Sequence, residues 1–374
     1  MSSQDRIAIV GGGVIGLSVA WELSQRNHQV TLFEVGQLGR KASWAGAGIL
    51  SPSNSKTVSH PLDKLMGLGS DLHRDWTGEL LEASGIDNGY HQCGGLYVAR
   101  TIGEKAALQG QLLNWDQYEI EYRRLADVAE LDLAANLNVG EDHLLVAVPG
   151  ESQICNPDHL KALAAACRKR GVELIENCDV NFRLQDDLVV VDSYAKPLDR
   201  ICFCAGAWTT PLMADLGIKV PLIPVRGQML LFKLDARIFE SIINEGSRYI
   251  VPRADGFVLV GSTTEEVGFD ESTTEEKLNE LMQFATSLVP ALNENTLENS
   301  WAGLRPASHD GFPFMGVLPG TRNGYVATGH FKAGLQMSPA VAVIMADLIE
   351  GKDSIMDVSP FNPGRLNLSD ALQE

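Results

Sequence analysis

The feature that most constrains this chain is a glycine-rich turn directly after a short apolar strand. Residues 6–10 (RIAIV) precede residues 11–16 (GGGVIG), in which three glycines match the spacing G-x-G-x-x-G. In this spacing the first glycine permits a tight turn, the second lets the backbone approach a pyrophosphate, and the third lets the next helix pack closely. Val14, Leu17 and Trp21 then recur at helical spacing. We therefore predict a βαβ unit that binds a dinucleotide.

An acidic residue refines which dinucleotide is expected. A second predicted strand, residues 30–33 (VTLF), ends at Glu34. Glu34 follows Gly16 at close to the roughly 20-residue spacing at which a carboxylate accepts hydrogen bonds from an adenosine ribose. Its negative charge disfavours a 2′-phosphate. The motif favours FAD or NAD over NADP and leaves the choice between FAD and NAD open.

Composition excludes several classes of protein. With 45% hydrophobic residues among 374, the chain can bury a large core, and its net charge of −18 argues against a nucleic-acid partner. No apolar run approaches the length of a membrane span, and the first strand starts too early for a signal peptide, so we expect a cytoplasmic protein. The six cysteines lack metal-site spacing, so no metal is expected, and Cys202 and Cys204 are interpreted as a buried thiol pair.

The order of elements predicts an α/β fold with two domains. A Rossmann-like βαβ domain is expected from residues 1–88, 150–215 and 320–374, in three pieces. Residues 89–149 and 216–319 alternate apolar and polar residues between turn signals, which is typical of an inserted, largely antiparallel β-sheet domain. Within the first domain, Asn156 is predicted to cap one helix, and Ser338-Pro339 to begin another that ends near Gly351.

This arrangement resembles the D-amino-acid oxidase family of flavoproteins, and within it the glycine oxidases of the thiazole branch of thiamine synthesis. The similarity covers nearly the whole chain and implies a FAD-binding domain beside a substrate-binding sheet. The segments that carry it are Gly11–Gly16 with Glu34, Ala42–Gly48, Pro224–Gln228, Tyr249–Arg253, Gly303–Pro306 and Gly329–Pro339.

The resemblance also implies how the cofactor is held. FAD is expected to bind non-covalently, because no cysteine follows Cys204 to tether it. The helix from Ser338 onward is expected to aim its positive end at the flavin pyrimidine, where it would stabilise the anionic reduced flavin. The expected cofactor-binding residues are Gly11, Gly13, Val14, Ile15, Gly16, Glu34, Ser43, Ala45, Gly46, Ala47, Gly48, Val180, Ala205, Gly206, Trp208, Arg305, His330, Phe331, Lys332, Ala333, Gly334 and Leu335.

Three residues are expected to meet the substrate. Arg305 is the candidate clamp for an amino-acid carboxylate, because a planar guanidinium holds two oxygens at once, and Tyr249 is a candidate hydroxyl donor. Lys332 departs from the Arg that glycine oxidases carry in this motif, and it offers a point charge in place of a fork. We hypothesise that its charge favours reaction of the reduced flavin with dioxygen. His330 is interpreted as a flavin-turn residue, since hydride transfer from a neutral amine needs no protein base.

The implied activity is oxidative deamination of glycine, and of sarcosine or small D-amino acids. Hydride passes from Cα to flavin N5, the imine hydrolyses, and dioxygen reoxidises the flavin to give hydrogen peroxide. The alternatives are a D-amino-acid dehydrogenase that passes electrons to another acceptor, and a flavin-binding protein without turnover. The expected partners are a small amino acid and dioxygen, and a homo-oligomer (a tetramer or dimer) is typical of the family.

Overall fold

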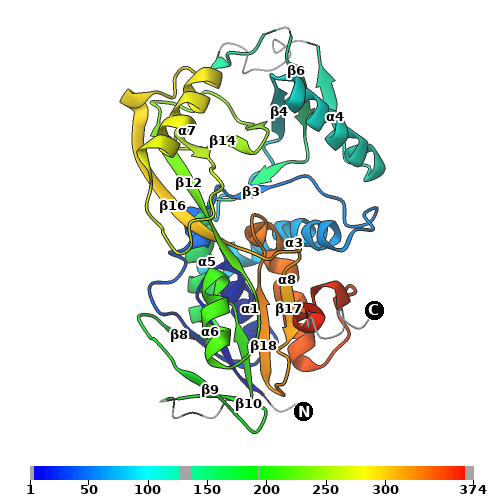
Figure 1. The fold of residues 1–374 in the computed structure, drawn as a ribbon, viewed down its shortest axis with the longest axis vertical. Coiled ribbons are helices and arrows are strands. Elements are labelled where there is room, and N and C mark those ends of the chain that lie inside the picture. Colours follow the sequence, from blue (N-terminus) through cyan, green and yellow to red (C-terminus); the bar gives the residue numbers. More distant parts are fainter. Residues whose placement is uncertain are drawn as a thin grey trace.

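A computed structural model describes residues 4–126, 136–140, 142–192, 194, 196 and 198–366 of the chain. Two lobes, each built around one large sheet, lie end to end (Figure 1). The first and last described residues, 4 and 366, belong to the lobe drawn at the bottom, and the long strands β12 (Ile223–Lys233) and β16 (Leu297–Ala307) rise from there into the other lobe. The chain passes between the lobes several times, so residues far apart in sequence meet at the junction.

The first lobe contains a six-stranded sheet in the order β17-β18-β11-β1-β2-β8. Neighbouring strands are parallel, except that β17 runs antiparallel to β18. The central strand is the one that precedes the glycine turn, as expected for a doubly wound fold. The strand bounds are β1 Arg6–Val10, β2 Gln29–Phe33, β8 Glu173–Ile175, β11 Arg200–Phe203, β17 Phe314–Val317 and β18 Gly324–Thr328.

Helices and a hairpin cover the two faces of this sheet. Successive side chains of β1 alternate between two buried clusters, with Ile7 and Ile9 in one and Ala8 and Val10 in the other. Four helices pack over the first cluster: α1 (Val14–Gln25), α3 (Pro61–Ser84), α5 (Asn156–Lys169) and α8 (Gly334–Glu350). The second cluster is covered by α6 (Thr209–Asp215) and by the hairpin of β9 (Phe182–Gln185) and β10 (Leu188–Val191).

The second lobe contains an eight-stranded sheet in the order β16-β12-β15-β14-β13-β4-β6-β5. All neighbours are antiparallel except β13 and β4. Helix α7 (Glu275–Leu288) contributes to the main core of this lobe and α4 (Ile102–Gln117) to a second cluster. The remaining strands are β4 Gly95–Ala99, β5 Arg123–Leu125, β6 Leu144–Val148, β13 Ile242–Glu245, β14 Arg248–Pro252 and β15 Phe257–Gly261.

The α/β fold class is confirmed, and three local details differ from expectation. Helix α5 is capped by Cys155, while the Asn156 side chain instead donates to the Ser43 carbonyl (2.7 Å). Helix α8 begins at Gly334, before Ser338-Pro339. Pro339 has no N–H for the Leu335 carbonyl, and this carbonyl instead accepts from His73 Nε2–H (2.8 Å) and the Ser338 hydroxyl (2.9 Å), so the turn before the proline stays helical. Strand β17 lies in the segment expected for the inserted domain, yet it pairs with β18 in the six-stranded sheet.

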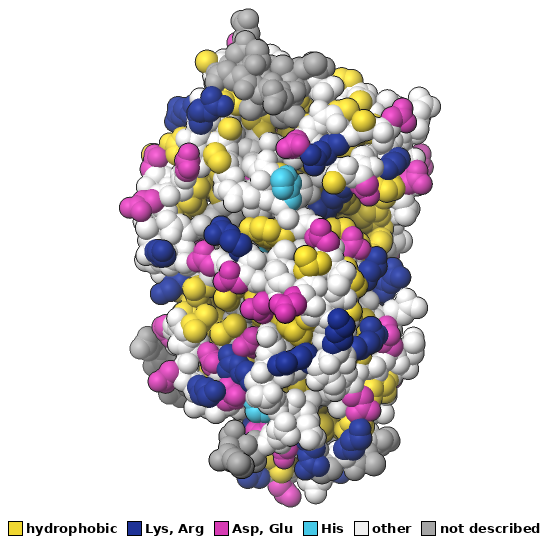
Figure 2. Space-filling view, turned by 180° about the vertical axis from the view of Figure 1, so that it is seen from behind, with side chains coloured by type: hydrophobic (Ala, Val, Ile, Leu, Met, Phe, Trp, Pro, Cys, Tyr) yellow, Lys and Arg dark blue, Asp and Glu magenta, His cyan; other side chains and the backbone are white. Residues whose placement is uncertain are grey.

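Surface and cysteine features complete the description. The Cys202 and Cys204 sulfurs lie 3.8 Å apart in the core, which confirms a buried thiol pair. Figure 2 shows basic and acidic side chains interspersed over the visible face. No helix in the described part of the chain is long and apolar enough to cross a membrane.

Candidate active site

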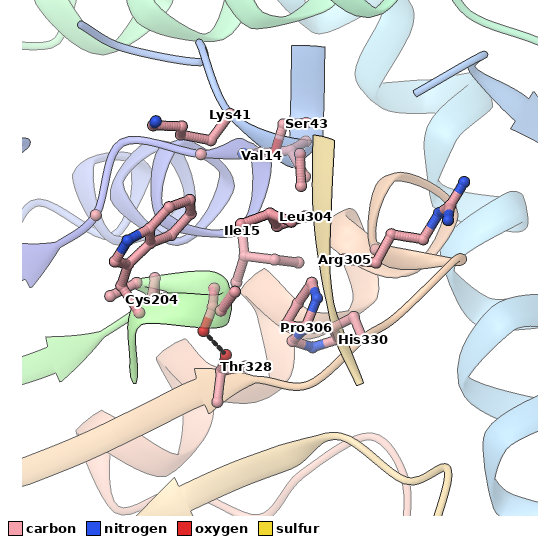
Figure 3. Close-up of a pocket in the computed structure, with 18 of the residues that line it drawn as sticks. Val14, Ile15, Lys41, Ser43, Cys204, Leu304, Arg305, Pro306, Thr328 and His330 are labelled. Atoms are coloured by element: carbon pink, nitrogen blue, oxygen red, sulfur yellow. Dashed lines mark hydrogen bonds between the residues drawn. The ribbon is translucent and has the colours of Figure 1, made fainter. Parts of the chain in front are cut away.

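A cavity of about 610 Å³ runs from the glycine turn to the underside of β12 and β16, at the junction of the lobes (Figure 3). Its lining brings together 21 of the predicted site residues, although they are widely separated in the sequence. Of the predicted site residues, only Gly16 and Ala333 lie outside the lining. The predicted residues that line it are Gly11, Gly13, Val14, Ile15, Glu34, Ser43, Ala45, Gly46, Ala47, Gly48, Val180, Ala205, Gly206, Trp208, Tyr249, Arg305, His330, Phe331, Lys332, Gly334 and Leu335.

The glycine turn fits an anionic group because its three glycines have different surroundings. Gly11 has a φ of +107°, and a Cβ there would lie 2.5 Å from the Cys204 carbonyl oxygen. A Cβ on Gly16 would lie 1.9 Å from the Gly11 oxygen, so Gly16 serves close packing. A Cβ on Gly13 would meet only the Ser43 hydroxyl, at 3.1 Å. The Gly13 backbone is therefore left open to a ligand at the positive N-terminal end of α1.

Two side chains shape this end of the cavity. The Ser43 hydroxyl accepts a hydrogen bond from the Val14 N–H (2.9 Å) and so lies at the first turn of α1. The Glu34 carboxylate accepts from the N–H groups of Gly12 (2.7 Å) and Gly36 (2.9 Å), which fixes it in the lining of the cavity. A fixed carboxylate with free lone pairs can accept hydrogen bonds from ribose hydroxyls.

The middle of the cavity is lined by the segment 45–48, whose other side contacts residues of the second lobe. The half-buried side chain of Arg253 donates to the Ala47 carbonyl (2.8 Å), and desolvation lowers its pKa. The Trp301 indole N–H donates to the Ala45 carbonyl (3.1 Å). A Cβ on Gly303 would lie 2.6 Å from the Ala45 Cβ, so the segment and β16 are in close contact. This flat, small-residue wall suits the ring system of a flavin.

Arg305 lies at the opposite end from the glycine turn (Figure 3). Its guanidinium donates to the Ser262 hydroxyl (2.8 Å) and the Thr263 carbonyl (3.1 Å), both neutral. A Cβ on Gly227 would lie 2.1 Å from Nη2, so the guanidinium rests on the bare backbone of β12. Among the described residues it has no carboxylate partner, and its charge can serve a ligand in the cavity.

The other two predicted substrate residues flank this end. The Tyr249 hydroxyl has one described hydrogen bond, a long one to the Met229 sulfur (3.5 Å), so it can donate to a better acceptor. Lys332 is exposed at the rim, with Nζ 5.3 Å from the centre of the Phe331 ring. Partial desolvation, and then the positive charge of Arg305, lower the pKa of Lys332.

Two buried polar atoms in the lining lack partners among the described residues. They are Nε2 of His330 and Oδ1 of Asn156. Burial lowers the pKa of His330 to about 3, so its imidazole is neutral at physiological pH and can form a hydrogen bond with a ligand through Nε2. Buried polar atoms without partners are costly unless a ligand or water satisfies them. With the open Gly13 backbone, they make the cavity a fit for a polar dinucleotide.

The first turn of α8 also borders the cavity, through Gly334 and Leu335. It is pinned from α3, since Nε2–H of His73 donates to the Leu335 carbonyl (2.8 Å). Burial lowers the pKa of His73 to about 4, which keeps the ring neutral. Gln336 donates to the Ser70 hydroxyl (2.9 Å). The positive N-terminal end of α8, which begins four residues before the predicted Ser338, is thus held at the cavity.

Sequence reasoning missed several lining or supporting residues. Gly227 lies in the Pro224–Gln228 segment, but the reason for a glycine there appears only in the structure, where the residue contacts the Arg305 guanidinium. Lys41 lines the cavity and precedes the Ala42–Gly48 segment directly. Ser262 follows β15, and nothing in its local sequence points to the Arg305 contact.

The first lobe has a doubly wound sheet with its cavity at the glycine turn, and the second sheet supplies an arginine that has no carboxylate partner among the described residues. This combination defines a dinucleotide-dependent oxidoreductase. Residues 6–348 match the family model described as FAD dependent oxidoreductase (DAO), and the chain belongs to this family. It is 35% identical over 369 residues to glycine oxidase of Pseudomonas aeruginosa, covering 97% of this chain and 100% of the relative.

Two further similarities agree. The crystal structure of glycine oxidase from Geobacillus kaustophilus superposes with a TM-score of 0.89 at 30% identity, covering 96% of this chain and 99% of that one. A bifunctional protein ThiO/ThiG of Nostoc sp. is 30% identical over 370 residues, covering 96% of this chain and 55% of the longer relative. The predicted family, enzyme class and FAD cofactor are confirmed.

Proposed function

We propose that this chain is a cytoplasmic FAD-dependent amino-acid oxidase whose main substrate is glycine, with sarcosine and small D-amino acids as further substrates. The observation that carries the proposal is Arg305, a cation without a carboxylate partner among the described residues, at the far end of a cavity that begins at the dinucleotide motif. The names of the most similar relatives support the choice of glycine.

The roles of the side chains follow from their chemistry. Arg305 binds the substrate carboxylate through two parallel hydrogen bonds, and Ser262 with Thr263 fixes the guanidinium from behind. The Tyr249 hydroxyl turns from Met229 to the same carboxylate. FAD, when bound, supplies the acceptor for the hydride that leaves Cα. The protein contributes orientation and charge, which can account for several orders of magnitude in rate.

The lining beside Arg305 leaves the carboxylate of a small amino acid free access to the guanidinium. Ala45 and Ala47 form one wall, and Gly227 lies beneath the guanidinium. Because Arg305 fixes the carboxylate, the α-hydrogen of a small amino acid faces the wall against which the flavin ring is expected to lie. We further propose dioxygen as the final electron acceptor and a place in the thiazole branch of thiamine synthesis. The ThiO/ThiG relative supports the pathway.

The proposal is tested by mixing the purified yellow protein anaerobically with glycine, sarcosine, D-alanine and D-proline separately, and then admitting air. We expect glycine to bleach the flavin fastest, with colour and hydrogen peroxide appearing in air. Bleaching followed by slow recovery in air, but fast recovery with an artificial acceptor, would favour the dehydrogenase. If none of the four bleaches the flavin, the glycine assignment is wrong.

A further inference from the structure

The loop 262–274, which follows β15, is fixed at its base to strand β12. The buried guanidinium of Arg226, 3% exposed, donates to Glu265 Oε2 (2.8 Å), to Asp270 Oδ2 (2.7 Å) and to the Ser272 carbonyl (3.0 Å). A buried cation shared by two carboxylates and a carbonyl holds a loop firmly, because moving any partner would leave the charge uncompensated. The path of the loop is therefore set by the second lobe.

The tip of this loop crosses to the first lobe. Glu271 Oε2 lies 2.5 Å from Lys41 Nζ. Lys41 Nζ lies 5.0 Å from the centre of the Trp208 ring, and the Phe269 ring centre lies 5.8 Å from the Trp208 ring centre. We call Lys41, Trp208, Phe269 and Glu271 the clasp. Phe269 is 48% exposed, so its packing on Trp208 is not part of a core. The clasp joins the two lobes through contacts that can open.

The clasp stands at the dinucleotide end of the cavity. Lys41 and Trp208 both line it. Lys41 directly precedes α2 (Ala42–Ala45), which carries the Ser43 hydroxyl to the first turn of α1. In Figure 3 Lys41 lies on the same side of the cavity as Cys204, well away from Arg305. Its charge therefore acts on the cofactor and not on the substrate carboxylate.

We propose that the clasp closes the cavity over bound FAD, so that FAD is released only after the tip of loop 262–274 lifts. Lys41 has a second role, since it lines the dinucleotide end of the cavity and its positive charge there attracts the diphosphate of FAD. Each contact of the clasp is partly exposed and individually weak. Together they lengthen the residence time of a cofactor that no covalent bond holds. This inference depends on FAD binding alone, and the identity of the amino-acid substrate does not affect it.

The test is the rate of FAD release from the holoenzyme on dilution, followed by the rise in flavin fluorescence. Phe269→Ala and Glu271→Gln are expected to release FAD about 3- to 10-fold faster than the wild type, the range for losing an exposed ring contact or ion pair. Lys41→Met is expected to release it at least about 10-fold faster, because it loses the ion pair, the ring contact and the charge. The thermal midpoints of the apoproteins, expected to be unchanged, confirm folding.

Two further variants separate the clasp from a simple charge effect. Glu280→Gln removes a comparable ion pair on α7, where Lys277 Nζ lies 2.6 Å from Glu280, and it should leave FAD release unchanged. Lys41→Glu combined with Glu271→Lys restores the pair with reversed charges and should release FAD more slowly than Lys41→Glu alone. The proposal is overturned if the double variant matches Lys41→Glu. It is also overturned if Phe269→Ala and Glu271→Gln both release FAD at the wild-type rate.

Discussion

The two ends of the cavity are built on different principles. At the dinucleotide end, the single segment 11–16 contributes Gly11, Gly13, Val14 and Ile15 to the lining, and a Cβ on Gly11 or Gly16 would overlap neighbouring backbone oxygens. At the substrate end, Arg305 from β16 and Tyr249 from β14 act through side chains, placed by strands that are distant in sequence. A backbone site tolerates no added atom, whereas a side-chain site tolerates change with a graded loss. The predictions below test this contrast.

The largest effect is expected at the dinucleotide end. Gly16→Ala would place its Cβ 1.9 Å from the Gly11 oxygen and force β1 and α1 apart. We expect a loss of roughly 3 kcal/mol or more in the free energy of unfolding, together with loss of bound FAD. The measurement is the urea midpoint and the flavin content of the purified protein.

Gly78→Ala provides the matched control for this substitution. Gly78 is exposed within α3, and a Cβ there meets nothing within 4 Å. The same change of one methyl group should therefore stabilise the protein, by about 0.5–1 kcal/mol, through helix propensity. A Gly16→Ala protein that keeps its flavin and its midpoint would contradict the backbone account of this end.

The next effect is expected at the substrate end. Arg305→Met should lower kcat/KM for glycine by about 10³-fold, because the carboxylate loses its charged partner, while FAD affinity stays unchanged. Gly227→Ala should lower it by about 10- to 100-fold, since its Cβ would displace a guanidinium that can shift. An equal loss of kcat/KM in the two variants, or a loss of bound FAD in either, would contradict the claim that side chains at the substrate end act separately from the FAD-binding backbone.

These differences also explain what the sequence could predict. The glycine spacing and Glu34 predicted the dinucleotide end. A site built from backbone needs glycines at fixed positions of one segment, and such a spacing can be recognised in a sequence. Arg305, Tyr249 and Lys332 were predicted only through the family resemblance. They lie in three separate segments, and no local sequence pattern indicates that these segments meet at one end of a cavity. The contact of Ser262 with Arg305 had no signal at all. The start of α8 was misplaced because Ser-Pro is a usual capping pair, whereas here Pro339 lies within the helix.

A third test concerns pH, because the lobes bury groups of opposite kind. In the second lobe Glu151 is 1% exposed, with hydrogen bonds from the Tyr97 hydroxyl (3.3 Å) and Asn244 (3.0 Å), and burial raises its pKa to about 8. The folded protein thus retains a proton that the unfolded chain releases above about pH 4.5. This stabilisation is complete below pH 4.5 and is lost as the pH rises to about 8.

Glu151→Gln should therefore stabilise the protein relative to the wild type by a few kcal/mol, roughly 2 to 4, at pH 8, and by nothing near pH 4.5. In the first lobe His73 and His159 are buried and neutral, with pKa values lowered to about 4 and about 3. Their contribution to the free energy of unfolding depends on pH in the opposite direction to that of Glu151. It is present above about pH 6.5 and is lost as the pH falls below that value. Urea midpoints between pH 4.5 and 8.5 measure both, and a pH-independent difference for Glu151→Gln would contradict this account.

The smallest effect is expected at the rim. Lys332→Met removes a cation that lies outside the guanidinium contact, so glycine affinity should fall by only about 3- to 10-fold. If its charge assists dioxygen, flavin reoxidation should slow by more than about twofold, as measured by stopped-flow mixing of reduced enzyme with oxygen. A slowing within twofold would remove that role and leave Lys332 as a side chain at the cavity mouth.

The most direct test of the central claim, that one cavity holds FAD at the glycine turn and a carboxylate at Arg305, is a titration of the oxidised holoenzyme with acetate. Acetate carries the carboxylate without an oxidisable amine, and its arrival beside the flavin is read from the visible flavin spectrum. We predict a saturable spectral change that glycine competes for in the wild type and that Arg305→Met loses. An unchanged acetate titration in Arg305→Met would contradict the account, because the carboxylate would then bind elsewhere.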